Sequence, residues 1–148
     1  MSRTPHLYAA VFGLFINDKW EVLLLKRQNT GYFDGGYSLP AWHVEDAELC
    51  SAALQHEMQE EIGITVTQQN LKPFHVIHRI AQDRQYFDIG YVITEWTGEI
   101  QNTEPDKCSA LEWFAFDALP EMITTEARTF VEAYRDKGAR FSEINMRG

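Results

Sequence analysis

Apolar residues along this chain recur at two spacings, a short one that favours strands and a longer one that favours helices. Leu7 to Ile16 and Trp20 to Arg27 are apolar runs on either side of the turn-forming Asn17-Asp18-Lys19, so we expect them to pair as a hairpin. Continuous apolar runs such as Val22 to Leu25 favour strands that are covered on both faces. Further strands are expected at 65–67, 72–80, 85–96 and 110–116, with 81–84 as a hairpin connection.

Two segments carry apolar residues at helical spacing. Between about Asp46 and Ile62 these residues recur every three or four positions, and Gly63 is expected to end the helix. A second helix is expected from Thr125 to Lys137, ended by Gly138. Its expected inward side chains are Ala127, Phe130, Val131 and Tyr134. The stretch 96–107 is rich in Gly, Asn, Pro and Asp, which favours a loop.

Three glutamates share one flank of the first helix near its C-terminal end. Glu57 and Glu61 have the i,i+4 spacing and Glu57 and Glu60 the i,i+3 spacing, so their carboxylates are neighbours. Each like-charged pair costs roughly 0.2–0.5 kcal/mol, and each exposed anion near a helix C-terminus costs about a further 0.3–1 kcal/mol. A bound cation would reverse both penalties; the alternative is a solvated acidic face.

The spacing around these glutamates is more specific than their charge. It runs Glu48-x7-His56-Glu57-Met58-Gln59-Glu60-Glu61-Ile62-Gly63-Ile64. This pattern resembles the Nudix box, Gly-x5-Glu-x7-Arg-Glu-U-x-Glu-Glu-x-Gly-U, where U is a large apolar residue. Two positions depart from the box: Trp42 stands where it begins with Gly, and His56 stands where it has Arg. The resemblance covers nearly the whole chain, because the Trp-x-Gly-Glu loop from Trp96 and the Trp-Phe and Leu-Pro pairs near residue 115 are also similar to Nudix chains.

The resemblance implies one Nudix-like domain over residues 1–148, with an α/β fold of the α/β/α sandwich type. Its mixed central sheet is expected to carry the box helix on one face and the C-terminal helix on the other. A length of 148 residues agrees with one domain built around one core.

The resemblance also implies metal and catalytic residues. The expected metal ligands are Glu61, Glu57 and Glu60, joined by the backbone carbonyl of Ala41. Glu57 and Glu60 are therefore expected to be catalytic, together with Glu104, which is expected to be a further ligand or a general base. The alternative for Glu104 is a loop glutamate that faces solvent.

Four other residues receive supporting roles from the resemblance. Arg27 is expected to bind substrate phosphates through its guanidinium, and the alternative is a strand-end charge in water. Glu48 and Gly63 are expected to be structural residues of the box. His56 is expected to stand in for the arginine that orients the following glutamate, with fewer donors.

Trp42 is the most conspicuous departure from the family pattern. A tryptophan at a position with positive φ would be strained by something like 1–2 kcal/mol. We expect its indole to point out of the cleft or to lie across it, where it would meet the substrate. Replacement of Trp42 by Gly is then expected to raise hydrolysis while fold stability changes little or rises.

The amino-acid composition and net charge limit the classes of binding partner. The chain has 22 acidic and 13 basic residues, a formal charge of −9 and a pI of about 4.9. This charge is opposite to the one that nucleic acid polymers require, whereas a small polyphosphate bound through a divalent metal remains compatible. No apolar run approaches the roughly 20 residues of a membrane helix, and Met1 to His6 shows no secretory signal. The two cysteines favour reduced thiols and a cytoplasmic location, and a monomer or homodimer is expected.

The resemblance therefore implies a pyrophosphohydrolase that cleaves a nucleoside diphosphate linked to another moiety. Mg2+ or Mn2+ is the expected cofactor, because hard divalent cations take oxygen ligands. A nucleoside triphosphate, including an oxidised one, is the first expectation for the substrate. One alternative is a nucleotide-binding or regulatory module whose chemistry is lost through Trp42 and His56. Another is an acidic interaction domain without a ligand site.

Overall fold

The computed structural model describes residues 7–147, so the expectation about Met1 to His6 lies outside the described residues. The elements are β1 (Leu7–Phe15), β2 (Glu21–Arg27), β3 (Tyr37–Ser38), β4 (Ala41–His43), α1 (Cys50–Ile62), the 3-10 helix η1 (Gln68–Asn70), β5 (Lys72–Ile80), β6 (Gln85–Ile93), β7 (Cys108–Ala115), α2 (Thr125–Asp136) and β8 (Phe141–Asn145). None of these helices is long and apolar enough to cross a membrane.

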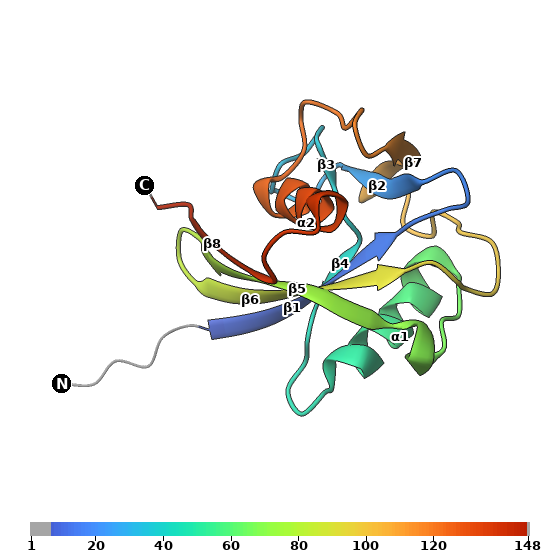
Figure 1. Ribbon diagram of the computed structural model, residues 1–148, viewed down its shortest axis with the longest axis horizontal. Helices are drawn as coiled ribbons and strands as arrows, with labels where there is room; N and C mark the ends of the chain where they lie inside the picture. Colours follow the sequence, from blue (N-terminus) through green and yellow to red (C-terminus); the bar gives the residue numbers. More distant parts are fainter. Residues whose placement is uncertain (1–6, 148) are drawn as a thin grey trace.

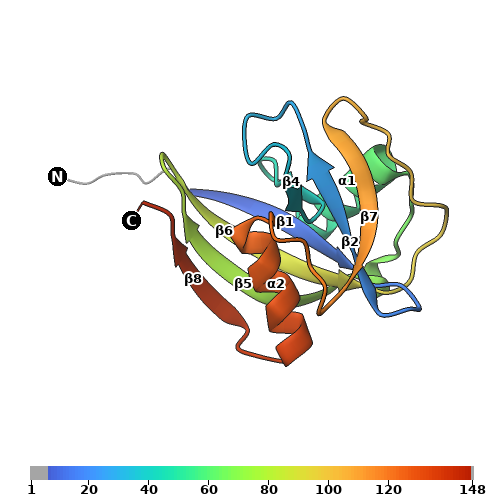
Figure 2. The ribbon, with the colours of Figure 1, turned by 90° about the horizontal axis from the view of Figure 1, so that it is seen from above.

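A five-stranded mixed sheet separates the two α-helices. Its strand order is β4-β1-β6-β5-β8, with β1 parallel to β6 and β5 parallel to β8. Figure 1 shows α1 and α2 on opposite faces of this sheet, which confirms the predicted α/β/α arrangement. A smaller antiparallel sheet has the order β3-β2-β7, and Figure 2 shows β2 and β7 side by side with α2 lying over β5.

β1 contributes to two apolar cores because its successive side chains point to opposite faces of the sheet. Phe12 and Leu14 pack on the α2 side with Phe130. Val11 and Phe15 belong to the core on the α1 side, which also contains Ala53, Leu54, Met58 and Ile62. The sheet is therefore covered on both faces, as the continuous apolar runs predict.

The predicted hairpin of Leu7–Ile16 with Trp20–Arg27 is wrong. A tight turn does form, in which Asn17 Oδ1 accepts the backbone N–H groups of Lys19 and Glu21. Among the described residues, however, the two strands share one isolated bridge, between Ile16 and Val22. Both edges of β1 are occupied by β4 and β6, so β2 pairs instead with β3 and β7.

The first helix begins later than predicted, at Cys50 rather than at about Asp46. The residues before it form a turn, in which the Glu48 N–H donates to the carbonyl of Glu45 at 3.1 Å and Ala47 takes a φ of 60°. The carboxylate of Glu48 accepts the Glu45 N–H at 2.9 Å, a structural role within the turn. The predicted end is confirmed, because Gly63 caps the helix in the left-handed region with a φ of 73°.

The second helix is predicted nearly correctly. Thr124 caps its N-terminus by accepting the Ala127 N–H, and Ala127, Phe130 and Val131 are buried as expected. Lys137, not Gly138, takes the left-handed cap position with a φ of 50°. Tyr134 is half-buried and packs against the same core.

Three short strands differ from the sequence-based expectation. β3, β4 and β8 carry no run of apolar residues long enough to indicate a strand, and each forms because an edge of a longer strand is open to it. Conversely, the expected strand at 65–67 is reduced to a single bridge between Thr65 and Thr97.

Candidate active site

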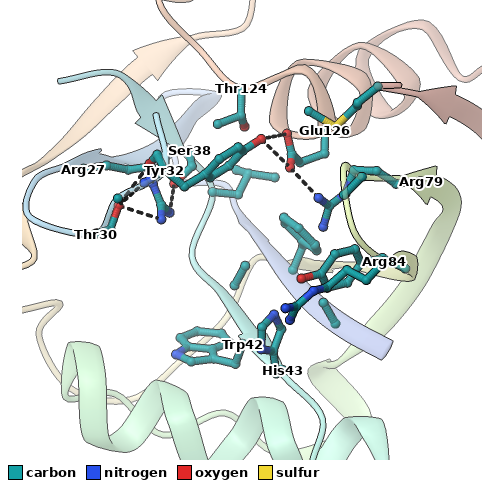
Figure 3. A pocket seen from close by; sticks show the side chains of 18 of the residues that line it. Arg27, Thr30, Tyr32, Ser38, Trp42, His43, Arg79, Arg84, Thr124 and Glu126 are labelled. Atoms are coloured by element: carbon teal, nitrogen blue, oxygen red, sulfur yellow. Dashed lines mark hydrogen bonds and ion pairs between the residues drawn. The ribbon is translucent and has the colours of Figure 1, made fainter. Parts of the chain in front are cut away.

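A cleft of about 930 Å³ opens between α1 and the N-terminus of α2. Figure 3 shows Trp42 on the α1 side, and Thr124 and Glu126 on the α2 side across the cleft. β1, β4 and the β5–β6 hairpin supply further lining residues, among them Phe12, His43 and Arg84. The cleft therefore brings together residues from both helices and from the mixed sheet.

The α1 glutamates divide between this cleft and the outer surface. Glu57 and Glu61 are half-buried and line the cleft. Glu60 is exposed and pairs with His56, whose Nε2 lies 3.1 Å from Glu60 Oε1. The structure thus brings Glu57 and Glu61 together at the cleft, whereas Glu60 and His56 face outward. The expected contact of His56 with the following glutamate gives way to one with Glu60, one helical turn on.

The environment of Glu61 is the most perturbed of the α1 carboxylates. Burial raises the pKa of Glu61 to about 7, the indole N–H of Trp42 opposes this rise, and the negative charges of Glu104 and Glu57 add to it. Glu61 therefore lies close to two other carboxylates in a partly desolvated position. Such crowding favours a bound cation and is typical of functional sites.

Trp42 occupies a position that the sequence does not predict. It lies in β4, where it pairs with Val11, and it is absent from the described residues that have positive φ. Its side chain is only 6% exposed, because it packs with the α1-side core that includes Leu54 and Met58. The expectations of backbone strain and of an indole pointing out of or across the cleft are therefore wrong. The indole forms part of the cleft wall and donates to Glu61 Oε2.

The loop between β6 and β7 brings Glu104 to the same site. A smaller pocket of about 140 Å³ is lined by Ala41, Glu61 and Glu104 together. The Glu104 carbonyl accepts the N–H groups of Lys107 and Cys108, and the Glu104 N–H donates to Asn102 Oδ1 at 3.1 Å. This backbone anchoring holds Glu104 at the same pocket as Glu61, and its role as ligand or general base stays a prediction.

Arg27 is held by the loop that follows β2. Its Nε donates to the Tyr32 carbonyl at 2.6 Å and its Nη2 to Thr30 Oγ1 at 3.1 Å, and these contacts are drawn in Figure 3. The guanidinium also lies 5.3 Å from the centre of the Tyr32 ring. Arg27 lines the cleft, and its role toward phosphate stays a prediction.

A buried charged cluster at the α2 end of the cleft is absent from the sequence-based site. Arg79 Nε donates to Asp88 Oδ2 at 2.7 Å, and its Nη1 lies 3.4 Å from Glu126 Oε2. The Tyr32 hydroxyl donates to the Glu126 carboxylate. Burial, reinforced by the charge of Glu126, raises the pKa of Tyr32 to about 12. One sequence signal points to the cluster: Arg79 and Asp88 occupy inward positions of alternating strands, where apolar residues are the rule.

Aromatic residues form another wall of the cleft. The rings of His43 and Tyr86 stack with their centroids 5.6 Å apart. The guanidinium of Arg79 lies 4.1 Å from the centre of the Tyr86 ring, and that of Arg84 lies 4.9 Å from the centre of the Tyr8 ring. This wall combines flat apolar surface with positive charge.

A protein-family model described as the NUDIX domain matches residues 6–134. This chain belongs to the NUDIX domain family. The resemblance drawn from the α1 glutamates is thereby confirmed, and so is the expectation of a hydrolase acting on phosphoanhydride bonds. Nudix enzymes generally use divalent metals.

Individual relatives agree with this assignment. A protein of Proteus vulgaris named 8-oxo-dGTP diphosphatase is 31% identical over 88 residues, which cover 60% of this chain and 77% of that protein. The crystal structure of a MutT NUDIX hydrolase from Burkholderia pseudomallei is similar with a TM-score of 0.77 and 28% identity, covering 85% of this chain and 96% of that chain. A MutT protein from Methanosarcina mazei shares the fold, with a TM-score of 0.74, 20% identity and coverage of 92% and 98%. The chain is thus a MutT-like Nudix hydrolase.

The donor set of this Nudix site fits a divalent cation. Glu57, Glu61 and Glu104 offer carboxylate oxygens, and a hard cation prefers oxygen ligands. The last turn of α1 contains no basic residue to neutralise its glutamates. A cation would relieve both the mutual repulsion of these carboxylates and their unfavourable position at the helix C-terminus.

Proposed function

We propose that this Nudix hydrolase is a metal-dependent pyrophosphohydrolase that cleaves a nucleoside diphosphate linked to another moiety. The observation that carries the proposal is that Glu57 and Glu61 open into the same cleft as Arg27. Carboxylates suited to a divalent cation and a guanidinium suited to phosphate oxygens thus line one cavity. A nucleoside triphosphate or an oxidised nucleoside triphosphate is the proposed substrate, in keeping with the name of the Proteus vulgaris relative.

The proposal gives each residue at the metal end of the cleft a role. Glu57, Glu61 and the Ala41 carbonyl hold Mg2+ or Mn2+ at the cleft, and Glu60 binds the cation from the outer flank of α1, beside Glu57. When bound, the cation polarises the pyrophosphate and lowers the pKa of bound water. Glu104 serves as a further ligand or as the general base, a role supported by its position beside Glu61.

The rest of the cleft is proposed to hold the nucleotide. Arg27 binds phosphate oxygens, since Thr30 and Tyr32 already fix the orientation of its guanidinium. The flat surface of His43 and Tyr86 offers stacking to a base, and Trp42 contacts the substrate through the part of its indole that lines the cleft. A volume of about 930 Å³ is at the upper end of the range usual for small-molecule sites, so a whole nucleotide fits.

The proposal is tested with a substrate panel. Purified protein is incubated with dGTP, 8-oxo-dGTP and the other nucleoside triphosphates, with Mg2+, with Mn2+ and with EDTA, and mononucleotide and pyrophosphate are quantified. We expect metal-dependent release from at least one triphosphate, lost in Glu61→Gln and retained in Glu95→Gln, an exposed glutamate outside the cleft. Absence of hydrolysis with every substrate and metal, combined with saturable nucleotide binding, would favour the regulatory module instead.

The proposal also covers the domain organisation, the cellular location, the oligomeric state and the binding partners. We propose a single Nudix-like domain over residues 1–148, a cytoplasmic location, and a monomer or homodimer that binds no nucleic acid polymer. The net charge of −9 supports the last point.

A further inference from the structure

The exposed flank of α1 holds a nitrogen ligand next to two carboxylates. His56, Glu57 and Glu60 offer ligand atoms that all lie within 4.8 Å of one another. His56 Nε2 and Glu60 Oε1 are 3.1 Å apart, and both side chains are 61% exposed. The two side chains have the i,i+4 spacing of neighbours on one helix face, and Glu57 lies beside them.

The spacing of these atoms matches that of adjacent ligands around one cation. Two ligand atoms that bind a metal at a right angle, each at about 2.1 Å, lie about 3.0 Å apart. The observed distance of 3.1 Å between His56 Nε2 and Glu60 Oε1 is close to this value. The two side chains come from successive turns of one helix, so a cation between them requires no change in the backbone.

The residue type decides which cation fits. Arginine, which the Nudix pattern has at this position, carries only N–H donors and cannot ligate a metal. Histidine offers a neutral imidazole nitrogen, a ligand that suits Zn, Ni, Cu and Fe, whereas Mg2+ prefers oxygen alone. The replacement therefore places a candidate nitrogen ligand where the family pattern has a side chain that cannot ligate a metal.

We propose that His56, together with Glu57 and Glu60, ligates a divalent transition metal and shifts the metal preference of this chain from Mg2+ toward cations that accept a nitrogen ligand, such as Ni2+. The proposal rests on the proposed function only in placing a cation at Glu57 and Glu60. The imidazole is an additional donor that the family pattern does not supply.

The test detects the nitrogen directly. Metal-free full-length protein is loaded with Mn2+, and electron spin echo envelope modulation reports whether an imidazole nitrogen is bound to the ion. We expect nitrogen modulation in the wild type, its loss in His56→Gln, and its retention in His43→Gln, which changes a histidine of the cleft wall. Calorimetry is expected to show at least a tenfold loss of Ni2+ affinity in His56→Gln and His56→Arg, and less than a twofold change in the Mg2+ affinity of His56→Gln.

The outcomes separate this inference from the proposed function. Nitrogen modulation that persists in His56→Gln, or that is missing from the wild type, overturns the inference, whether or not the protein hydrolyses nucleotides. Nitrogen modulation that depends on His56, in a protein that hydrolyses nothing, supports the inference and counts against the proposed function alone. An adventitious ion held by other surface histidines would give a signal indifferent to the His56 substitutions and would also overturn it.

Discussion

The indole N–H of Trp42 donates a hydrogen bond to Oε2 of Glu61. This contact joins a residue of β4 to the last turn of α1 and fixes one carboxylate oxygen at the cleft. The hydrogen bond favours the ionised form of Glu61 against the effect of burial. A residue that departs from the family pattern thus supports a glutamate that the pattern requires.

Trp42→Phe is expected to weaken binding of Mg2+ or Mn2+ by about tenfold, because it removes the donor that orients Glu61 and keeps most of the aromatic volume. Calorimetric titration of metal-free protein measures the affinity. Trp113→Phe is the matched control, because Trp113 packs against the same core from β7. Equal affinities in the wild type and Trp42→Phe would show that the contact does not position the ligand.

Trp42→Gly is expected to lower the free energy of unfolding by about 3–5 kcal/mol, since it removes a buried indole from the α1-side core. The sequence alone predicts little change or a gain, and the extended backbone of Trp42 removes the reason for that prediction. Urea unfolding followed by circular dichroism measures the difference. A variant as stable as the wild type would contradict the packing described here.

Glu57→Gln and Glu61→Gln are each expected to lower metal affinity by at least about tenfold, or about 1.4 kcal/mol. The physical reason is the loss of an anionic ligand from a partly buried carboxylate group. Saturating Mn2+ is expected to raise the melting temperature of the wild type and of Glu95→Gln more than that of Glu57→Gln or Glu61→Gln. Thermal melts with and without Mn2+ measure the difference. Unchanged calorimetric binding in both variants would rule out these two residues as ligands.

Arg79→Met is expected to destabilise the fold by about 3–5 kcal/mol, because it leaves Asp88 and Glu126 buried without their counterion. Arg84→Met breaks the exposed pair with Asp83 and is expected to change the free energy of unfolding far less than Arg79→Met does. Chemical denaturation of both variants gives the comparison. Similar losses of unfolding free energy in the two variants would show that the buried cluster contributes no more to stability than the exposed pair does.

His75 is expected to make the fold less stable in acid. It is buried between Phe74 and Phe130, its Nε2 lies 2.7 Å from Ser142 Oγ, and burial lowers its pKa below the ordinary value of 6.5. The unfolded chain therefore binds a proton as the pH falls through 6.5 while the folded chain does not, so stability is present above that pH and declines below it.

His75→Gln is expected to lose less unfolding free energy than the wild type between pH 7.5 and pH 5.5. Parallel pH dependence in the wild type and His75→Gln would indicate that another group causes the acid sensitivity.

The periodicity of the sequence predicts most of the long elements, and the spacing of the glutamates predicts which helix carries the site. The pairing of the β-strands is predicted less well, because an apolar run such as Val22 to Leu25 does not indicate which strand is its hydrogen-bonded neighbour. The turn at Ala47 also escapes prediction, since alanine seldom takes a positive φ.

In the candidate site too, contacts between residues close in sequence are predicted, and contacts that depend on tertiary packing are not. Glu57 and Glu61 are neighbours in sequence, so their association follows from helical spacing alone. Arg79, Asp88 and Glu126 meet only after β5, β6 and α2 have packed, and no local pattern connects them. Trp42 is misjudged because its place in an edge strand depends on pairing with β1.

The position of β1 between the two cores has a consequence for the nascent chain. β1 leaves the ribosome before its parallel neighbour β6 has been translated, and during that interval neither of its faces has a complete set of partners. Contacts so distant in sequence close slowly, and incomplete sheets expose apolar surface. The strand that contributes to both apolar cores therefore stays incompletely covered on both faces until β6 and α2 have been synthesised.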